Sequence, residues 1–251
     1  MKYYKKLFSI LFCLIYIFSI TSSAESNTKN WYIVKRGNCE PGFPSEATFL
    51  SDHNCYYIDK SNSKKLYLTF DAGYENGNIE KILDIMKEND IKGAFFVLSN
   101  LVKKNTDLVK RMSEEGHLVC NHTSNHKNLT KLTKEEIKCN LERLENEYNT
   151  LTGMKMQKIF RYPEGQYNKD TVLTIEKLGY KTFFWSLAYA DWDNNKQPND
   201  QKAKELLLNN THNGAVILLH PTSSTNVAIL GDLIDAWRSD GYEFKTVEAL
   251  P

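Results

Sequence analysis

The sequence has no marked excess of charge of either sign. Its 251 residues include 32 Lys and Arg side chains against 31 Asp and Glu, which gives a formal net charge of +1. Cleavage of the N-terminal segment after Ala24 would remove three lysines and no acid, leaving 29 basic and 31 acidic side chains. Proteins that bind nucleic acids through a charged face carry a clear excess of Lys and Arg. We therefore expect no nucleic-acid partner.

Cysteine is scarce, with five residues in the whole chain. No two of them form a Cys-x-x-Cys motif, which excludes zinc ribbons and thioredoxin-type redox chemistry. A domain of this size does not need disulfides to fold. Cys39 and Cys55 flank a loop-like stretch, and both a disulfide and two free thiols remain open there, because geometry decides such a pairing.

The apolar run near the N terminus is too short to span a bilayer. It extends over the 14 residues 7–20, and a helix of that length measures about 21 Å against a hydrocarbon core of about 30 Å. Its flanks are basic before it and small after it: Lys2, Lys5 and Lys6, then Ser22, Ser23 and Ala24. This pattern predicts a signal peptide, residues 1–24, and a secreted, extracytoplasmic protein without a permanent membrane anchor.

The chain after residue 64 alternates short β-rich runs with amphipathic helical stretches. We expect strands at 66–70, 93–98, 117–121, 158–161, 182–187, 215–219 and 243–247. Most are continuously apolar, as parallel strands buried on both faces are. Thr133 and Glu136 predict a capping box at the start of the longest helix, and Asn168 or Asp170 caps the next. The alternation predicts an α/β fold, an irregular (β/α) barrel of about seven parallel strands resembling a TIM barrel.

Residues 25–64 differ from the rest of the chain, because they are rich in Ser, Asn, Gly and Pro. Such a composition is typical of turns and loops. We therefore expect an irregular N-terminal extension at 25–64 that lies over a catalytic domain at 65–251.

Polar residues follow five of the expected strands, where the active site of an α/β barrel lies. They are Asp71, His122 and His126, Arg161, Asp191, and His220. This set supplies two carboxylates, three imidazoles and a guanidinium, the groups of a metal-assisted hydrolase. The spacing of His122 and His126 would place both on one face of a helical turn, where they can share a cation.

Each of these residues also has an ordinary structural interpretation. Asp71 has the position of an acid in a strand-to-turn junction, and histidines four residues apart are common on protein surfaces. Arg161 is also consistent with a surface ion pair, and His220 with a core or capping role. The functional interpretation is favoured because all of them would converge on one face of one barrel.

Five ordered motifs then carry a resemblance to a known family. They are Leu-Thr-Phe-Asp-Ala-Gly (68–73), Gly-His-Leu-Val-Cys-Asn-His-Thr-Ser-Asn-His (116–126), Phe-Arg-Tyr-Pro-Glu-Gly (160–165), Trp-Ser-Leu-Ala-Tyr-Ala-Asp-Trp (185–192) and Leu-Leu-His-Pro (218–221). In order and spacing the sequence resembles the polysaccharide deacetylases, carbohydrate esterase family 4, over about residues 64–251. Tyr-Glu-Asn-Gly (74–77) and His-Pro-Thr-Ser (220–223) are similar to the delta-lactam branch, which acts on muramic acid in spore-cortex peptidoglycan.

The resemblance implies roles for the catalytic residues. Asp71 corresponds to the general base and His220 to the general acid. Arg161 would orient Asp71 and keep it ionised. Asp191 would tune either His220 or Arg161, and the sequence leaves that choice open. The backbone N–H of Glu164 would stabilise the tetrahedral oxyanion.

The resemblance also implies a metal and a substrate-binding wall. His122 and His126 would hold a divalent cation, and neutral imidazoles suit zinc. The sequence departs from the family at Ala72, where a further ligand, an aspartate or an amide, is usual; Ala72 cannot ligate, so we expect weak binding. Residues implied in substrate binding are Trp185, Trp192, Leu218, Tyr162 and Pro163.

The sequence therefore predicts a secreted hydrolase of the linear amide bond in N-acetylated wall glycan. The expected substrate is N-acetylmuramic acid in a peptide-free peptidoglycan strand, as a step toward muramic delta-lactam in spore cortex. One alternative is deacetylation of N-acetylglucosamine in peptidoglycan or of chitin oligomers. A second is a catalytically weakened wall-binding protein, which Ala72 suggests and which an intact Asp71 and His220 oppose. Oligomeric state and lactam closure are left open.

Overall fold

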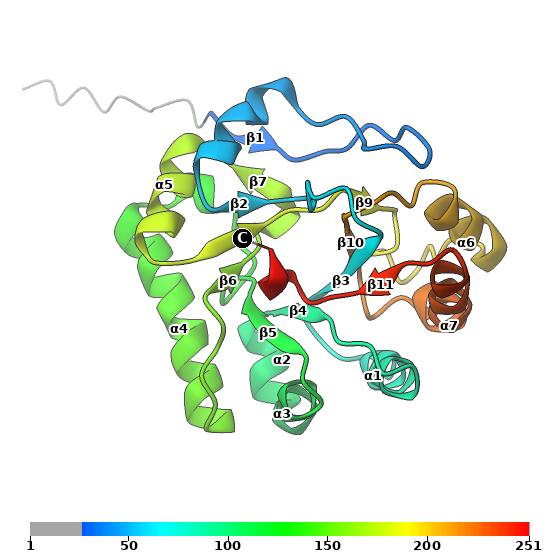
Figure 1. Ribbon diagram of the computed structural model, residues 1–251. Helices are drawn as coiled ribbons and strands as arrows, with labels where there is room; N and C mark the ends of the chain where they lie inside the picture. Colours follow the sequence, from blue (N-terminus) through cyan, green and yellow to red (C-terminus); the bar gives the residue numbers. More distant parts are fainter. Residues whose placement is uncertain (1–26, 251) are drawn as a thin grey trace, which may run out of the picture.

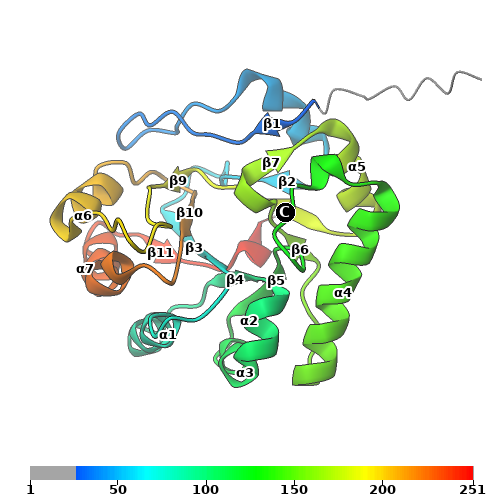
Figure 2. The same ribbon diagram turned by 180° about the vertical axis from the view of Figure 1, so that it is seen from behind.

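A single curled sheet with helices around its outside organises the protein (Figures 1 and 2). The computed structural model describes residues 27–250, so the predicted signal peptide lies outside the described residues. Neighbouring strands in the main sheet follow the order β2-β8-β6-β5-β4-β3-β10-β9, and β11 pairs with β3. All of these pairings are parallel. The predicted irregular barrel of parallel strands is thereby confirmed.

The main-sheet strands in chain order are β2 (Cys55–Tyr56), β3 (Lys65–Ala72), β4 (Ala94–Val97), β5 (Leu118–Asn121), β6 (Ile159–Phe160), β8 (Lys181–Phe183), β9 (Leu187–Ala188), β10 (Ala215–Leu219) and β11 (Glu243–Phe244). A separate antiparallel pair joins β1 (Lys29–Asn30) to β7 (Gln166–Tyr167). The helices are α1 (Ile79–Glu88), α2 (Ser99–Lys104), α3 (Thr106–Glu114), α4 (Lys134–Thr152), α5 (Lys169–Lys177), α6 (Asp200–Leu208) and α7 (Ser224–Ser239). Short 3-10 turns are η1 (Ser45–Asp52), η2 (Leu129–Lys131), η3 (Pro163–Gly165) and η4 (Val247–Ala249).

The central strand β3 separates two parts of the core. Leu66, Leu68 and Phe70 belong to the cluster that contains the buried stripe of α1. Tyr67, on the alternate face, packs with apolar residues of β4, β5, β8 and β10 in a separate cluster. This division follows from the two-residue period of a strand. The face of Tyr67 is also that of Asp71, which places the acid on the inner side of the curled sheet.

The N-terminal caps of two helices were predicted correctly from the sequence. Thr133 and Glu136 form the expected capping box at the start of α4: the Glu136 N–H donates to Thr133 Oγ1 at 3.2 Å, and the Thr133 N–H to Glu136 Oε2 at 2.8 Å. Of the two candidates for α5, Asn168 is the cap, because its Oδ1 accepts from the Thr171 N–H at 2.9 Å.

The strand predicted at 182–187 is divided into β8 and β9, which lie at different places in the sheet. Phe184 N donates to Tyr56 O of β2 at 2.8 Å, whereas Ser186 N donates to Val216 O of β10 at 2.9 Å. Residues 184–186 thus pass from pairing with β2 to pairing with β10. This segment closes the gap between the two ends of the curled sheet. A continuous strand could not reach both ends.

The N-terminal extension is more integrated than its composition suggests. It contributes β2 to the main sheet, and Trp31 is only 4% exposed. The Trp31 ring stacks on Phe184 at 4.6 Å between centroids, and its Nε1 donates to Trp185 O at 2.9 Å. Cys39 and Cys55 are both free thiols. Within residues 27–250 no helix is long and apolar enough to cross a membrane.

Candidate active site

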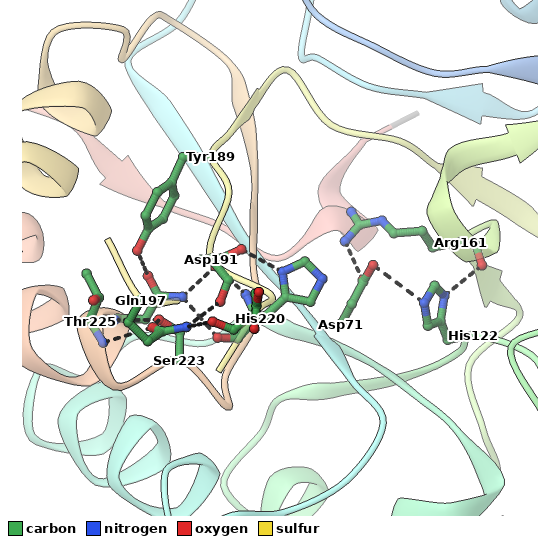
Figure 3. A network of polar contacts seen from close by, with 11 residues as sticks. Asp71, His122, Arg161, Tyr189, Asp191, Gln197, His220, Ser223 and Thr225 are labelled. Carbon is green, nitrogen blue, oxygen red and sulfur yellow. Dashed lines mark hydrogen bonds and ion pairs between the residues drawn. The ribbon is translucent and has the colours of Figure 1, made fainter. Parts of the chain in front are cut away.

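A cavity of about 750 Å³ opens at the C-terminal ends of β3 and β10. It is lined by Asp71, His126, Glu164, Trp185, Ala188, Tyr189, Ala190, Trp192, Leu218 and His220. Seven of these ten residues were expected from the sequence, while Ala188, Tyr189 and Ala190 were not singled out. Three further predicted residues contact this lining (Figure 3): His122 and Arg161 contact Asp71, and Asp191 contacts His220.

Arg161 holds Asp71 in a fixed orientation. Its side chain is fully buried, and Nη1 donates to Asp71 Oδ1 at 2.9 Å. Nε and Nη2 donate to the backbone oxygens of Phe183 and Phe184 at 3.0 and 3.1 Å. The guanidinium carbon also lies 4.1 Å from the centre of the Phe96 ring, a cation–π contact. Because Oδ1 of Asp71 is engaged, Oδ2 is the oxygen left to accept a proton.

The surroundings of Asp71 favour its ionised form. Burial raises the pKa of the carboxyl, but the charges of His122, Arg161 and His220, with the hydrogen bond from Arg161, hold the pKa below its ordinary value. The Arg161 guanidinium carries its charge throughout the accessible pH range. Asp71 is thus a carboxylate at neutral pH, as a general base must be.

His220 forms a tight pair with Asp191, which settles the choice that the sequence left open. Nδ1–H of His220 donates to Asp191 Oδ1 at 2.7 Å, and the His220 backbone N–H donates to Oδ2 at 2.7 Å. Burial lowers the pKa of His220, but the hydrogen bond and charge of Asp191 outweigh it and raise the pKa above the ordinary value. The pair leaves Nε2 as the ring nitrogen that faces the cavity.

Sequence reasoning missed the group that supports this pair. Asn226 is fully buried in α7, and its Nδ2 donates to Asp191 Oδ2 at 2.6 Å. The sequence signal was weak, because Asn226 lies six residues beyond His220 inside a helical stretch. Only the path of the chain, which returns α7 to the strand ends, brings the amide to the site.

His122 and His126 do come together, but not on a helical turn. Residues 122–126 form an irregular loop in which Thr123 and His126 have positive φ of 74° and 57°. The expected helical geometry is therefore wrong, and a turn fixed by the bond from the His126 N–H to Thr123 Oγ1, 2.9 Å, replaces it. The two imidazole centroids lie 5.0 Å apart. The two rings thus lie close together, as the four-residue spacing predicted, but because of this turn rather than a helix.

The orientation of His122 suits a metal ligand. Its Nδ1–H donates to Arg161 O at 2.9 Å, so Nε2 carries the free lone pair and points toward Asp71 Oδ2 at 3.5 Å. Burial lowers the pKa of His122 to about 4, which keeps the ring neutral at neutral pH. Two acceptor atoms then face each other, an arrangement that a cation stabilises. The donor set fits a divalent metal of the kind that imidazole prefers.

This donor set is nevertheless small. No group of three or more His, Cys, Asp or Glu side chains within residues 27–250 is arranged to hold a metal ion. Ala72, at the position of the usual additional ligand, is fully buried in the apolar cluster that also contains Phe70. Within the described residues, His122 and His126 are therefore the candidate metal ligands without a third such side chain beside them.

A strained turn places the Glu164 backbone on the cavity wall. Glu164 has a φ of 54° and follows Pro163 in η3. The next residue, Gly165, has a φ of 65°, and a Cβ there would lie 2.9 Å from Trp185 Cη2. The N–H of Gly165 donates to Tyr162 O at 3.0 Å, so of these two residues Glu164 is the one whose backbone N–H is the candidate donor to the cavity.

Of the five residues predicted to bind substrate, three line the cavity and two do not. Trp185, Trp192 and Leu218 line the cavity, and the Trp192 ring lies 6.3 Å from that of His220. Tyr162 is fully buried and packs on Phe160 and Phe184, because its strand end points into the core. Pro163 is also buried and does not line the cavity.

Comparison with known proteins decides the family. The family model described as polysaccharide deacetylase matches residues 59–183. The chain is 34% identical over 223 residues to the peptidoglycan-N-acetylmuramic acid deacetylase PdaA of Bacillus subtilis, covering 88% of this chain and 85% of that protein. It belongs to the polysaccharide deacetylases. The fold agrees, since the solved structure of B. subtilis PdaA, a family 4 carbohydrate esterase, superposes with a TM-score of 0.86 at 34% identity, covering 90% and 97% of the two chains.

A further relative matches this chain over less than half of the relative's own length. The peptidoglycan-N-acetylglucosamine deacetylase PgdA of Listeria monocytogenes is 32% identical over 188 residues, which is 75% of this chain and 39% of that protein. The predicted resemblance to carbohydrate esterase family 4 is confirmed, and this polysaccharide deacetylase is a hydrolase.

Proposed function

We propose that this deacetylase acts on peptidoglycan outside the cell and removes the acetyl group of N-acetylmuramic acid, as a step toward the muramic delta-lactam of spore cortex. The observation that carries the proposal is the presence of Asp71 and His220 in one cavity, where a lowered pKa favours the carboxylate of Asp71 and a raised pKa favours the protonated ring of His220. The substrate part rests on similarity to PdaA over most of both chains.

The geometry supports different roles for Asp71 and His220 in the proposed reaction. Asp71 Oδ2 takes a proton from the attacking water, while Arg161 holds Oδ1. Water oxygen bonds to the acetyl carbon, and the backbone N–H of Glu164 stabilises the oxyanion that forms. His220 then gives its Nε2 proton to the leaving nitrogen, so that the C–N bond breaks into acetate and a free amine. Asp191 keeps the other ring nitrogen of His220 occupied.

His122 and His126 would hold a divalent metal, for which we propose zinc. When bound, such an ion polarises the acetyl carbonyl and the attacking water. The chain itself orients His122 through the carbonyl of Arg161 and keeps its ring neutral by burial.

The test of the substrate is mass spectrometry of purified glycan strands after incubation with the protein. Strands with and without side-chain peptides are compared, and chitin oligomers serve as the reference. We expect acetate release from peptide-free N-acetylmuramic acid, since lactam formation requires a free lactyl carboxyl. Equal rates on chitin oligomers would favour the alternative that similarity to PgdA supports, an N-acetylglucosamine deacetylase. Binding of strands without any acetate release would favour a wall-binding protein.

The extracytoplasmic part of the proposal rests on the sequence of residues 1–24. Basic residues, a short apolar run and small residues before Glu25 together form a complete export signal. N-terminal sequencing of the exported protein should give a start near Glu25. A membrane-bound chain that begins at Met1 would show that the segment is an anchor.

A further inference from the structure

Asn226 is a fully buried polar residue beside the site whose every polar side-chain atom is engaged. It is the third residue of α7, and its backbone N–H donates to the N-cap oxygen Ser223 Oγ at 3.1 Å. Its Nδ2 donates to Asp191 Oδ2 at 2.6 Å and to the backbone oxygen of His220 at 2.9 Å. Its Oδ1 accepts from the hydroxyl of Tyr189 at 2.5 Å.

These bonds restrict the rotation of the Asp191 carboxylate. Oδ2 accepts from both the His220 backbone N–H and Asn226 Nδ2, which leaves Oδ1 facing the Nδ1–H of His220. The same amide holds the peptide of His220 through its carbonyl. The carboxylate and the imidazole are therefore fixed to one common support.

We propose that Asn226 is a positioning residue for the general acid: it locks Asp191 and the backbone of His220 into the one arrangement in which the Nε2–H of His220 faces the leaving nitrogen. This inference rests on the proposed role of His220. Asn226 reaches no substrate itself and acts through its two partners, while its bond to Tyr189 joins the acid to the cavity wall.

The chemistry of the position suits an amide. The anionic Asp191 requires a donor and the Tyr189 hydroxyl requires an acceptor, and a carboxamide supplies both. The charged groups that face His220 are Asp191, from the segment after β9, Asp71 of β3 and Arg161 at the end of β6. A carboxylate at 226 would add a negative charge next to Asp191 and would remove the donor to it.

The decisive variant is Asn226→Asp, which keeps the shape and the acceptor for Tyr189 but loses the donor at neutral pH. We expect kcat to fall by about the 10- to 100-fold that loss of a supporting residue costs around metal ligands. KM should stay constant. The pKa of His220, followed by ¹⁵N NMR, should change, and the alkaline limb of the kcat profile should move with it. Asn226→Ala frees Asp191 to rotate, so there the pKa of His220 and the limb should shift down.

Thr225→Val is the matched control. Thr225 is the neighbouring residue, is buried, and uses its hydroxyl on Pro198 O at 2.7 Å without contacting Asp191 or His220. This variant should lose stability like the Asn226 variants while kcat and the pH profile stay unchanged. If Thr225→Val lowers kcat as much, or if both Asn226 variants keep the wild-type kcat and the wild-type pKa of His220, the positioning role is refuted.

Two further variants separate the possible failures. His220→Ala should abolish turnover, and an active His220→Ala protein would refute the proposed role of His220 as the general acid, and with it the role of Asn226. A wild-type protein without deacetylase activity would instead refute the proposed function. If neither Asn226 variant folds, Tyr189→Phe decides, because it removes one anchor of the amide and leaves Asn226 in place. We then expect a smaller downward shift of the His220 pKa, and an unshifted value would overturn the proposal.

Discussion

At the scale of single residues, burial and charged neighbours decide the chemistry of each proposed catalytic group. Asp71 and His220 line the same cavity, yet the charges of His122, Arg161 and His220 lower the pKa of Asp71 against its burial, while Asp191 raises the pKa of His220 against its burial. A base and an acid with pKa values separated in this way are both in the active form over a common pH range.

Asp71→Asn should abolish the base and also destabilise the fold. We expect turnover to fall by about 10²- to 10⁴-fold, the contribution typical of general-base catalysis. The fully buried Arg161 would lose its counter-ion, which costs about 3 kcal/mol when a buried pair is broken. Acetate release and thermal unfolding by circular dichroism measure the two effects. A folded variant with wild-type turnover would exclude Asp71 as the base.

Asp191→Asn should narrow the active pH range from the alkaline side. The acid must be protonated, and a raised pKa keeps His220 protonated to higher pH. Without the charge of Asp191 that pKa falls, so the alkaline limb of kcat should move to lower pH. A pH series of kcat for both proteins tests this shift. If the alkaline limb of kcat does not move, it reports the titration of a group other than His220.

Ala72→Asp should tighten metal binding at a cost in apo stability. Ala72 is fully buried among apolar side chains, so a carboxylate there is destabilising unless a cation neutralises it. We expect a lower melting temperature without metal, a larger stabilisation by zinc than in the natural protein, and an affinity at least about tenfold higher. Calorimetry with zinc, using Ala72→Asn as the uncharged control, measures the affinity. Nanomolar binding by the natural protein would show that a third ligand is already present.

At the scale of elements, the sequence predicted what depends on local pattern and missed what depends on long-range geometry. The strand ends that carry Asp71, Arg161 and His220 follow from apolar runs, and the capping box of α4 follows from two residues. The division of the strand at 182–187 could not be predicted in this way, because Phe184 and Ser186 pair with β2 and β10, which are distant in sequence. The loop geometry of His122 and His126 was missed for a different reason, because the positive φ values of Thr123 and His126 are unusual for residues other than glycine and the sequence does not signal them.

Gly165→Ala tests the strained turn of η3. The residue has a positive φ of 65°, and a left-handed conformation costs an L-residue about 1–2 kcal/mol. The added Cβ would also press on the Trp185 ring at 2.9 Å, which lines the cavity. We expect a lower melting temperature and a raised KM. The control is Gly153→Ala, which has a similar φ of 74° and open space around its Cβ, and should lose stability without a change in KM.

At the scale of the whole molecule, the N-terminal extension completes the barrel. Its strand β2 pairs with β8, and Ile58 bridges to Ala215 at the start of β10. Composition alone predicted that residues 25–64 form an irregular extension, because the two-residue strand β2 leaves no periodic pattern in the sequence. Sequence-based boundaries at residue 64 would therefore cut through the sheet.

A chain that begins at Lys65 should fail to fold cooperatively. It would lack β2 and Trp31, whose ring is buried against Phe184, and removal of such a core tryptophan alone typically costs about 3–5 kcal/mol. A chain that begins at Glu25 is the control and should unfold in one transition. Circular dichroism and ANS fluorescence distinguish the two. A sharp transition at the same temperature for the shorter chain would make residues 25–64 an independent cover.

Arg161 links the segment that closes the barrel to the candidate active site. Its guanidinium binds the carbonyls of Phe183 and Phe184, where the barrel closes, while also holding Asp71, and its own carbonyl orients His122. The closure of the barrel and the orientation of the proposed catalytic base thus depend on the same side chain. A chain whose barrel is not closed would therefore lack an oriented Asp71, so deacetylase activity would report on complete folding.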